Sequence, residues 1–188
     1  MVKGDNRSGF RIGGLPPVGV HPAFIHKLTR YFGTFPITGS EEVEMSIFTT
    51  FEDYDHDSPF YFSVFICALY RNDSKMFQCV FHKPSPRAKK SEIKSDLEGC
   101  VIEVGRESED DEGSSHMIGG VHFFEHYHPK VRETSAALLG EGFIRLLQLS
   151  FPGPQDTGVK GLWQFGNDAL HLYIKETKGR YEYAALLA

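Results

Sequence analysis

Several features that would point to a familiar function are missing from this chain. No apolar run approaches the roughly 18 residues of a membrane-spanning helix. The first 20 residues lack the apolar core of a signal peptide. Three cysteines at wide, irregular spacing (Cys67, Cys79 and Cys100) indicate neither a disulfide framework nor a zinc ribbon. We therefore expect a cytoplasmic protein that has no membrane partner.

Positive charge and the common catalytic signatures are also scarce. Lysine and arginine number 20 against 25 aspartates and glutamates, a net charge of −5, which argues against a nucleic-acid partner. The sequence contains no Gly-x-Ser-x-Gly, Gly-x-x-x-x-Gly-Lys or Gly-x-Gly-x-x-Gly motif, so the usual hydrolase, nucleotide and dinucleotide machinery is not indicated. We expect a protein that is not an enzyme and needs no cofactor.

Glycine and aromatic residues are abundant instead, with 19 Gly, 10 Pro and 16 Phe in 188 residues. Together with alternating apolar segments, this composition predicts a β-rich α+β fold of mostly antiparallel sheets with few short helices, in one domain over 1–188. Residues 60–104 supply its central strands. The apolar run 60–70 is interpreted as a buried strand that turns at Asn72-Asp73-Ser74 and pairs with 75–82. Other strands are expected at 31–37, 44–51, 99–104, 143–151, 162–165, 169–175 and 180–187, and a helical turn or two within 22–31.

A short sequence pattern occurs twice. Arg11-Ile12-Gly13-Gly14 is echoed by Met117-Ile118-Gly119-Gly120, and each copy is followed by a strand ending in Phe-Pro and then by an amphipathic strand. The echo suggests two pseudo-symmetric β half-domains, built from 10–54 and 116–176. Chance recurrence is the alternative, because Gly-Gly pairs are common in a glycine-rich chain.

The same residues carry a resemblance to a known family. Ile118-Gly119-Gly120, then Leu147-Gln148-Leu149, and then the segment from Trp163 to Tyr173 resemble the YwqG-like family of bacterial proteins of unknown function, as does Gly13-Gly14-Leu15-Pro16. The chain departs from the family pattern at Val121-His122, where proline is common. Members have no established catalytic residues, and some occur beside bacterial toxins. The resemblance therefore implies an immunity or inhibitor protein whose partner is a cognate toxin.

A histidine-rich segment offers an alternative function. His122, Glu125, His126 and His128 could bind a divalent transition metal, as a metal-binding protein or metal-dependent enzyme would. One local conformation does not satisfy all the spacings, because His126 and His128 share a face in a strand whereas His122 and His126 share one in a helix. A partly exposed aromatic segment without metal, or a protein-contact surface, explains the same residues.

An acidic loop and an aromatic group are the candidate partner contacts, with a solvated loop as the alternative for the acidic residues. The acidic run could imitate phosphate and occupy a basic cleft of the toxin. The acidic run consists of Glu107, Glu109, Asp110, Asp111 and Glu112. The aromatic group, next to the histidines, consists of Phe123, Phe124 and Tyr127. A second stretch of surface acids is expected at Glu41, Glu42, Glu44, Asp53, Asp55 and Asp57. The basic loop containing Lys83, Arg87, Lys89, Lys90 and Lys94 is expected to be solvated.

Two remaining motifs have mainly structural interpretations. Gly13-Gly14 is expected to supply positive φ or close backbone packing at a turn, with a ligand cradle of backbone N–H groups as the alternative. Cys79 and His82 are three residues apart on an expected strand and should face opposite ways, which argues against a catalytic Cys-His pair.

Overall fold

The computed structural model describes most of the chain and divides it into two compact units. Its described residues are 10–26, 29–37, 39–50, 68–72, 74, 77–95, 97–101, 116–118, 129–149 and 169–187. Unit 1 comprises Met1–Thr50, Lys75–Ser114 and Pro152–Gln164, and unit 2 comprises Phe51–Ser74, Ser115–Phe151 and Phe165–Ala188. Each unit is therefore assembled from separate stretches of sequence.

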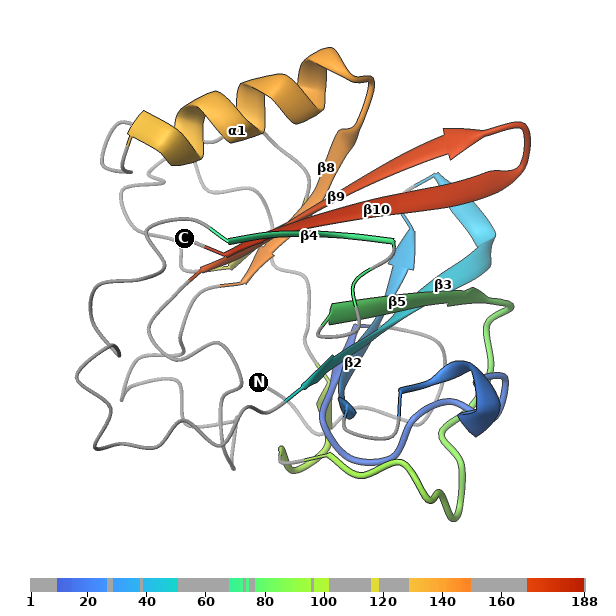
Figure 1. Cartoon of the computed structure of the whole chain (residues 1–188). Helices are drawn as coiled ribbons and strands as arrows, with labels where there is room; N and C mark the ends of the chain where they lie inside the picture. Colours follow the sequence, from blue (N-terminus) through green and yellow to red (C-terminus); the bar gives the residue numbers. More distant parts are fainter. Residues whose placement is uncertain are drawn as a thin grey trace, which may run out of the picture. The chain divides into compact units, whose positions relative to one another are not determined.

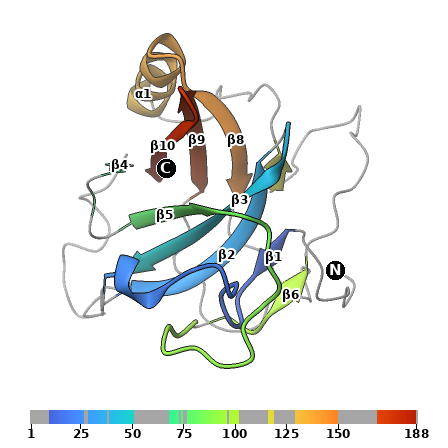
Figure 2. The same ribbon diagram turned by 90° about the vertical axis from the view of Figure 1, so that its right-hand side faces the viewer.

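Unit 1 contains a five-stranded antiparallel sheet, here called sheet 1, in the order β5-β3-β2-β1-β6 (Figure 2). Its strands are β1 (Arg11–Ile12), β2 (Thr29–Ile37), β3 (Ser40–Thr50), β5 (Phe77–His82) and β6 (Cys100–Val101). A short 3-10 helix, η1 (Pro22–Phe24), precedes β2. Strands β2, β3, β5 and β6 overlap segments that the sequence predicts to be extended, whereas β1 lies in a stretch where no strand is expected.

Both faces of the central strands of sheet 1 are buried. Phe35, Met45 and Ile47 lie on one face, each at most 1% exposed. On the other face Tyr31 and Phe48 pack with Val20 and Ile93, which come from the two loops that run across this face. Because loops rather than another strand or helix supply this covering layer, their own polar groups need partners on the sheet.

Unit 2 contains a second five-stranded antiparallel sheet, sheet 2, in the order β4-β10-β9-β8-β7. Figure 1 labels β4, β10, β9 and β8 of this sheet. Its elements are β4 (Ala68–Arg71), β7 (His116–Ile118), α1 (Pro129–Gly140), β8 (Ile144–Leu149), β9 (Leu170–Thr177) and β10 (Arg180–Leu187). Helix α1 buries Val131 and Leu138 against Tyr173, Ala184 and Leu186 of the sheet. Full burial of such aliphatic side chains is worth about 1.5–3 kcal/mol each.

The C-terminal end of α1 is closed by a glycine turn. The Gly142 N–H donates to Leu139 O at 3.0 Å and the Phe143 N–H to Leu138 O at 3.1 Å, with Gly142 at φ +88°. This bonding pattern is the Schellman motif. The cationic groups of Arg71 and Lys175 each lie 5.7 Å from the centre of the Phe143 ring, so the turn is fixed to the sheet.

The two sheets share an order of strand pairing. In sheet 1 each of β1, β2, β3 and β5 pairs antiparallel with the next, and in sheet 2 so do β7, β8, β9 and β10. Strands β1 and β7 are those that precede the two Gly-Gly pairs of the sequence echo. Superposition of the two halves by a near-twofold rotation stays a prediction, because Gly119 and Gly120 lie outside the described residues.

The predicted β-rich α+β class is confirmed, but the strand pairing expected in the middle of the chain is wrong. Of the strand expected at 60–70, residues 60–67 lie outside the described residues, and the described part, β4, lies at one end of the described strand order of sheet 2 with Leu69 40% exposed. Its expected partner, β5, pairs with β3 in the other sheet. The turn signal at Asn72 does end β4, and the Asn72 side chain accepts a hydrogen bond from Tyr183 N–H at 2.9 Å. The chain then passes into unit 1 instead of forming a hairpin.

Helix α1 was not expected from the sequence. Its buried residues, Val131, Ser135 and Leu138, form a narrow stripe that includes a serine, while Leu139 is 48% exposed. The apolar periodicity is therefore weak. Among the described residues, no helix has the length and apolar character needed to cross a membrane.

Candidate functional site

Polar side chains form a hydrogen-bonded chain beneath the loops of unit 1. The Tyr31 hydroxyl lies 2.8 Å from Thr34 Oγ1, which lies 2.7 Å from Ser46 Oγ, which in turn lies 2.8 Å from His82 Nε2. Tyr31 and Thr34 are three residues apart, yet a β-bulge between Tyr31 and Gly33 puts both on the same face. Three strands thus deliver four polar groups to one buried line.

The direction of this chain follows from its last member. His82 Nδ1 lies 2.8 Å from the Lys83 carbonyl, which can only accept, so Nδ1 carries the proton. In the neutral imidazole Nε2 then accepts from Ser46, Ser46 from Thr34, and Thr34 from Tyr31. Burial lowers the pKa of His82 below its ordinary value of 6.5, while burial raises the pKa of the Tyr31 hydroxyl. Both shifts favour the neutral network.

A buried ion pair lies beside this network. Arg11 and Glu44 are 0% and 1% exposed, and Arg11 Nη2 donates to Glu44 Oε2 at 2.8 Å. Arg11 Nη1 also donates to Ser85 O at 3.0 Å, which ties the basic loop to the sheet. The expectation that Glu44 is a surface acid is therefore wrong: it lies beneath a loop, whereas Glu41 and Glu42 are exposed.

Cys79 and His82 do not form a catalytic pair. Cys79 is opposite Ile47 and His82 is opposite Glu44 in the ladder between β5 and β3, so their side chains project from opposite faces, as predicted. Burial raises the pKa of the Cys79 thiol well above its ordinary value, which disfavours the reactive thiolate. Both ring nitrogens of His82 are already hydrogen-bonded.

The structural interpretation of Gly13-Gly14 is confirmed. Both glycines have positive φ, +65° and +74°, and a Cβ on Gly13 would come within 2.6 Å of Leu97 O. Their N–H groups donate to Phe32 O and Leu97 O at 2.7 and 2.9 Å. The alternative of a ligand cradle is wrong at these two positions, because the fold already uses both donors.

The loop at 13–20, which begins with Gly13-Gly14 and is called the glycine loop below, lies beside the basic loop. Val18 N–H donates to Pro86 O at 3.0 Å and Ala88 N–H donates to Pro16 O at 2.9 Å. The Arg87 guanidinium lies against Gly14 and Gly99, and a Cβ on Gly99 would require the guanidinium to shift. Two loops that are some 70 residues apart in sequence are therefore joined into one surface.

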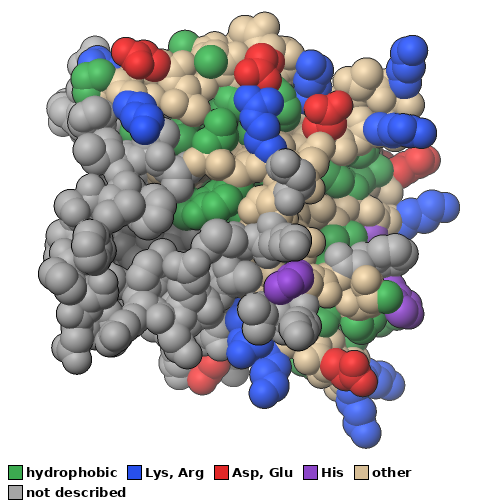
Figure 3. All heavy atoms as spheres, in the orientation of Figure 1, with side chains coloured by type: hydrophobic (Ala, Val, Ile, Leu, Met, Phe, Trp, Pro, Cys, Tyr) green, Lys and Arg blue, Asp and Glu red, His purple; other side chains and the backbone are tan. Residues whose placement is uncertain are grey.

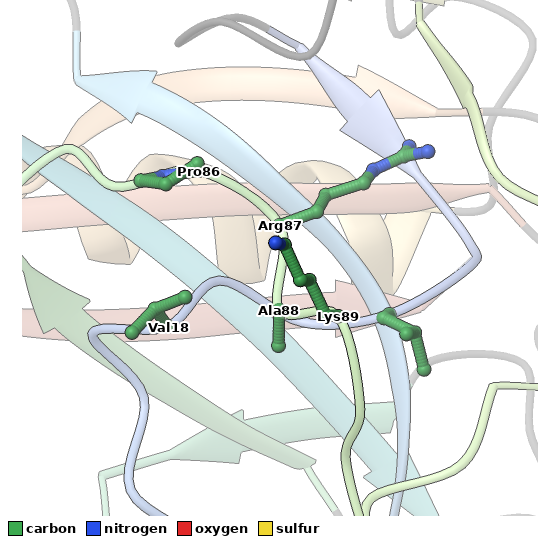
Figure 4. Close-up of a pocket in the computed structure, with 6 residues that line it drawn as sticks. Val18, Pro86, Arg87, Ala88 and Lys89 are labelled. Atoms are coloured by element: carbon green, nitrogen blue, oxygen red, sulfur yellow. The ribbon is translucent and has the colours of Figure 1, made fainter.

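A hollow opens between these two loops, and we call it the loop pocket (Figure 4). Its lining is Leu15, Val18, Pro86, Arg87, Ala88 and Lys89, and its volume is about 710 Å³. Val18 is 65% exposed at its edge. The pocket combines apolar side chains with two cations, and this combination suits an amphipathic, acidic ligand or protein segment.

The described lining of the loop pocket contains none of the predicted site residues. The acidic run, the aromatic residues Phe123, Phe124 and Tyr127, and the metal candidates from His122 to His128 all lie outside the described residues. Among the residues that are described, no group of three or more His, Cys, Asp or Glu side chains could hold a metal ion. The partner and metal interpretations of those segments stay predictions.

The loop pocket itself was missed by the sequence reasoning. The glycine loop and the basic loop are both visible as motifs, but their contact depends on backbone bonds between residues 16–18 and 86–88. On the face shown in Figure 3, cationic and acidic side chains are interspersed over the described surface. Charge counted along the sequence is therefore a poor guide to which of these groups share a site.

Comparisons with known proteins return no match: no family model, no curated protein and no solved structure is similar to this chain at a significant level.

Proposed function

We propose that this chain is a cytoplasmic immunity protein that neutralises a cognate bacterial toxin by binding it, without catalysis and without a nucleic-acid or membrane partner. The observation that carries the proposal is the arrangement of reactive side chains in unit 1. The His82 imidazole and the hydroxyls of Tyr31, Thr34 and Ser46 form one hydrogen-bonded chain beneath the loops. Arg11 and Glu44 form a separate buried ion pair. In the loop pocket, in contrast, the apolar Val18 and the cationic Lys89 are exposed.

The chemistry of the buried groups favours binding over catalysis. A general base must reach a substrate proton, and a nucleophile must be ionised or activated by a neighbouring base. His82 directs Nδ1 to its own chain and Nε2 to Ser46, and the raised pKa of Cys79 keeps its thiol protonated. These residues stabilise the sheet and its loops. We therefore assign the function of unit 1 to binding by its surface.

The sequence resemblance indicates which class of protein the partner belongs to, namely a bacterial toxin. The Gly-Gly elements and the segment from Trp163 to Tyr173 resemble a family with members encoded beside toxins. An immunity protein acts by occupying a surface of its target, so shape and charge complementarity are sufficient. The echoed strand order of the two units agrees with the repeated Gly-Gly elements on which the resemblance depends.

The test distinguishes binding from catalysis by stoichiometry. The full chain would be titrated into the toxin encoded beside its gene while residual toxin activity is measured, and the toxin would be weighed by mass spectrometry before and after. We expect complete inhibition at a one-to-one ratio with an unchanged toxin mass. Inhibition by a small fraction of an equivalent, or a covalent change in the toxin, would contradict the proposal and favour an enzyme.

A further inference from the structure

The loop pocket exposes apolar surface that its own unit does not bury. Val18 is 65% exposed, while its backbone is held by the bond from Val18 N–H to Pro86 O. Leu15, Pro86 and Ala88 extend the apolar lining inward. A partner side chain placed here would gain about 25 cal/mol for each Å² of apolar surface that leaves water.

The charge around the pocket is positive in an acidic chain. Residues 83–94 contain five cations, the basic loop defined above, and one acid, Glu92, whereas the whole chain carries −5. Lys89 and Lys90 are exposed, and no ion pair with a described acid neutralises either of them. A concentration of one sign of charge selects a partner of the opposite sign and raises its association rate.

The pocket is held in shape before any partner arrives. Positive φ at Gly13 and Gly14, and the close packing of Gly13 on the 97–98 backbone, fix the glycine loop. The Ser85 carbonyl accepts from the buried Arg11, which fixes the base of the basic loop. A preorganised surface loses little conformational entropy on binding, so even a few contacts contribute fully to affinity.

The open form of the pocket favours a protein segment over a small molecule. Pockets for small ligands enclose most of the ligand surface, whereas the pocket edge at Val18 stays 65% exposed. We infer that the loop pocket is the docking site for a partner-protein segment that carries Asp or Glu beside a large apolar side chain. The apolar group enters between Leu15, Val18 and Ala88, and the carboxylates face Lys89 and Lys90. The inference rests on the proposed function in taking the toxin as that partner.

The first test uses peptides, so it does not require the toxin. The ¹⁵N-labelled full chain would be titrated with acetyl-Asp-Glu-Leu-Phe-Asp-amide and with the counterpart in which lysine replaces each acid. We expect saturable amide shifts at Leu15, Val18 and Gly19 and at 87–90 with the acidic peptide alone, weakening as salt is raised. Equal shifts with both peptides, or no shifts at these residues, would overturn the inference. So would a heparin oligosaccharide that displaces the peptide and binds more tightly, because the surface would then be selecting polyanions.

Charge reversal on the basic loop and on helix α1 supplies the matched variants. Lys89→Glu/Lys90→Glu should weaken acidic-peptide binding by about tenfold or more at low salt. Lys130→Glu/Arg132→Glu makes the same change in charge on exposed positions of α1 in unit 2, and should leave binding unchanged. Equal losses in both variants would mean that net charge, not the pocket, controls binding. The spectra of both variants also report whether the fold is retained.

The toxin titration separates this inference from the proposed function. If Lys89→Glu/Lys90→Glu still neutralises one equivalent of toxin with unchanged affinity, the function stands and the docking site is wrong. If peptide binding behaves as expected but the chain neutralises no toxin, the immunity function is wrong and the pocket serves another acidic protein.

Discussion

His82 makes the stability of unit 1 depend on pH through a single proton. Protonation would turn Nε2 into a donor, reverse the bonds through Ser46 and Thr34, and leave the buried Tyr31 hydroxyl without its acceptor. Burial is the largest cause of the lowered His82 pKa, while Glu44 raises it and Arg11 lowers it. The folded state therefore binds this proton less readily than the unfolded state, whose pKa is near 6.5.

A histidine with a depressed folded pKa contributes full stability above the unfolded pKa and loses it as pH falls below that value. We expect the free energy of unfolding to fall between pH 7 and pH 5 more steeply in the wild type than in His82→Gln, measured by urea denaturation. The His82 ring signals in NMR should titrate below pH 6.5. Identical pH slopes for the two proteins would show that His82 is not responsible.

The Arg11–Glu44 pair gives a second prediction at the scale of single residues. Glu44→Gln keeps the size of the side chain but leaves the Arg11 charge unpaired in a site where both residues are at most 1% exposed. Removing one partner of a buried pair costs about 3–5 kcal/mol. We expect a loss of that order in chemical denaturation, with Arg11→Met/Glu44→Met much less destabilised than Glu44→Gln. A loss below about 1 kcal/mol would be typical of a solvent-exposed pair.

At the scale of elements, local sequence signals identify strands better than they identify partners. The strand predicted at 180–187 has those bounds in the structure. Strand β5 was placed correctly but paired wrongly, since its partnership with β3 is decided by side chains such as His82 and Ser46 that meet only in the fold. For the same reason, the sequence of the glycine loop or of the basic loop alone could not predict the backbone contact that forms the loop pocket.

The β9–β10 hairpin allows the conformational cost of one glycine to be isolated. Lys178 and Gly179 have φ of +54° and +75°, as a two-residue type I′ turn requires, and a Cβ on Gly179 would meet no atom within 4 Å. Gly179→Ala should therefore destabilise unit 2 through backbone strain alone, by about 1 kcal/mol. Lys178→Asn, which suits positive φ, should stabilise it by about 0.5 kcal/mol. Thermal unfolding of both variants checks the two signs, and a neutral Gly179→Ala would contradict this turn geometry.

At the scale of the whole molecule, the chain interleaves its two units. The middle of the sequence gives β4 to sheet 2 and β5 to sheet 1, although the two strands are only a few residues apart. Unit 2 therefore depends on a segment that lies, in the sequence, between the two covering loops of unit 1. No single cut can divide such a chain into two pieces that each contain a complete unit.

This interleaving predicts fragment complementation. A fragment 1–114 contains β4 without β10, and a fragment 115–188 contains β10 without β4, so each carries an unpaired half of a four-residue ladder from Ala68 to Arg71. Unpaired edges of this kind associate with a complementary strand. Expressed together, the fragments should copurify as a one-to-one complex, whereas separately each should aggregate or stay partly unfolded by circular dichroism. Leu186→Asp, at a fully buried position of β10 opposite Leu69, should prevent the association, and Lys178→Asp at the hairpin should not. If the two fragments fold independently and do not associate, β4 is not needed for the folding of sheet 2.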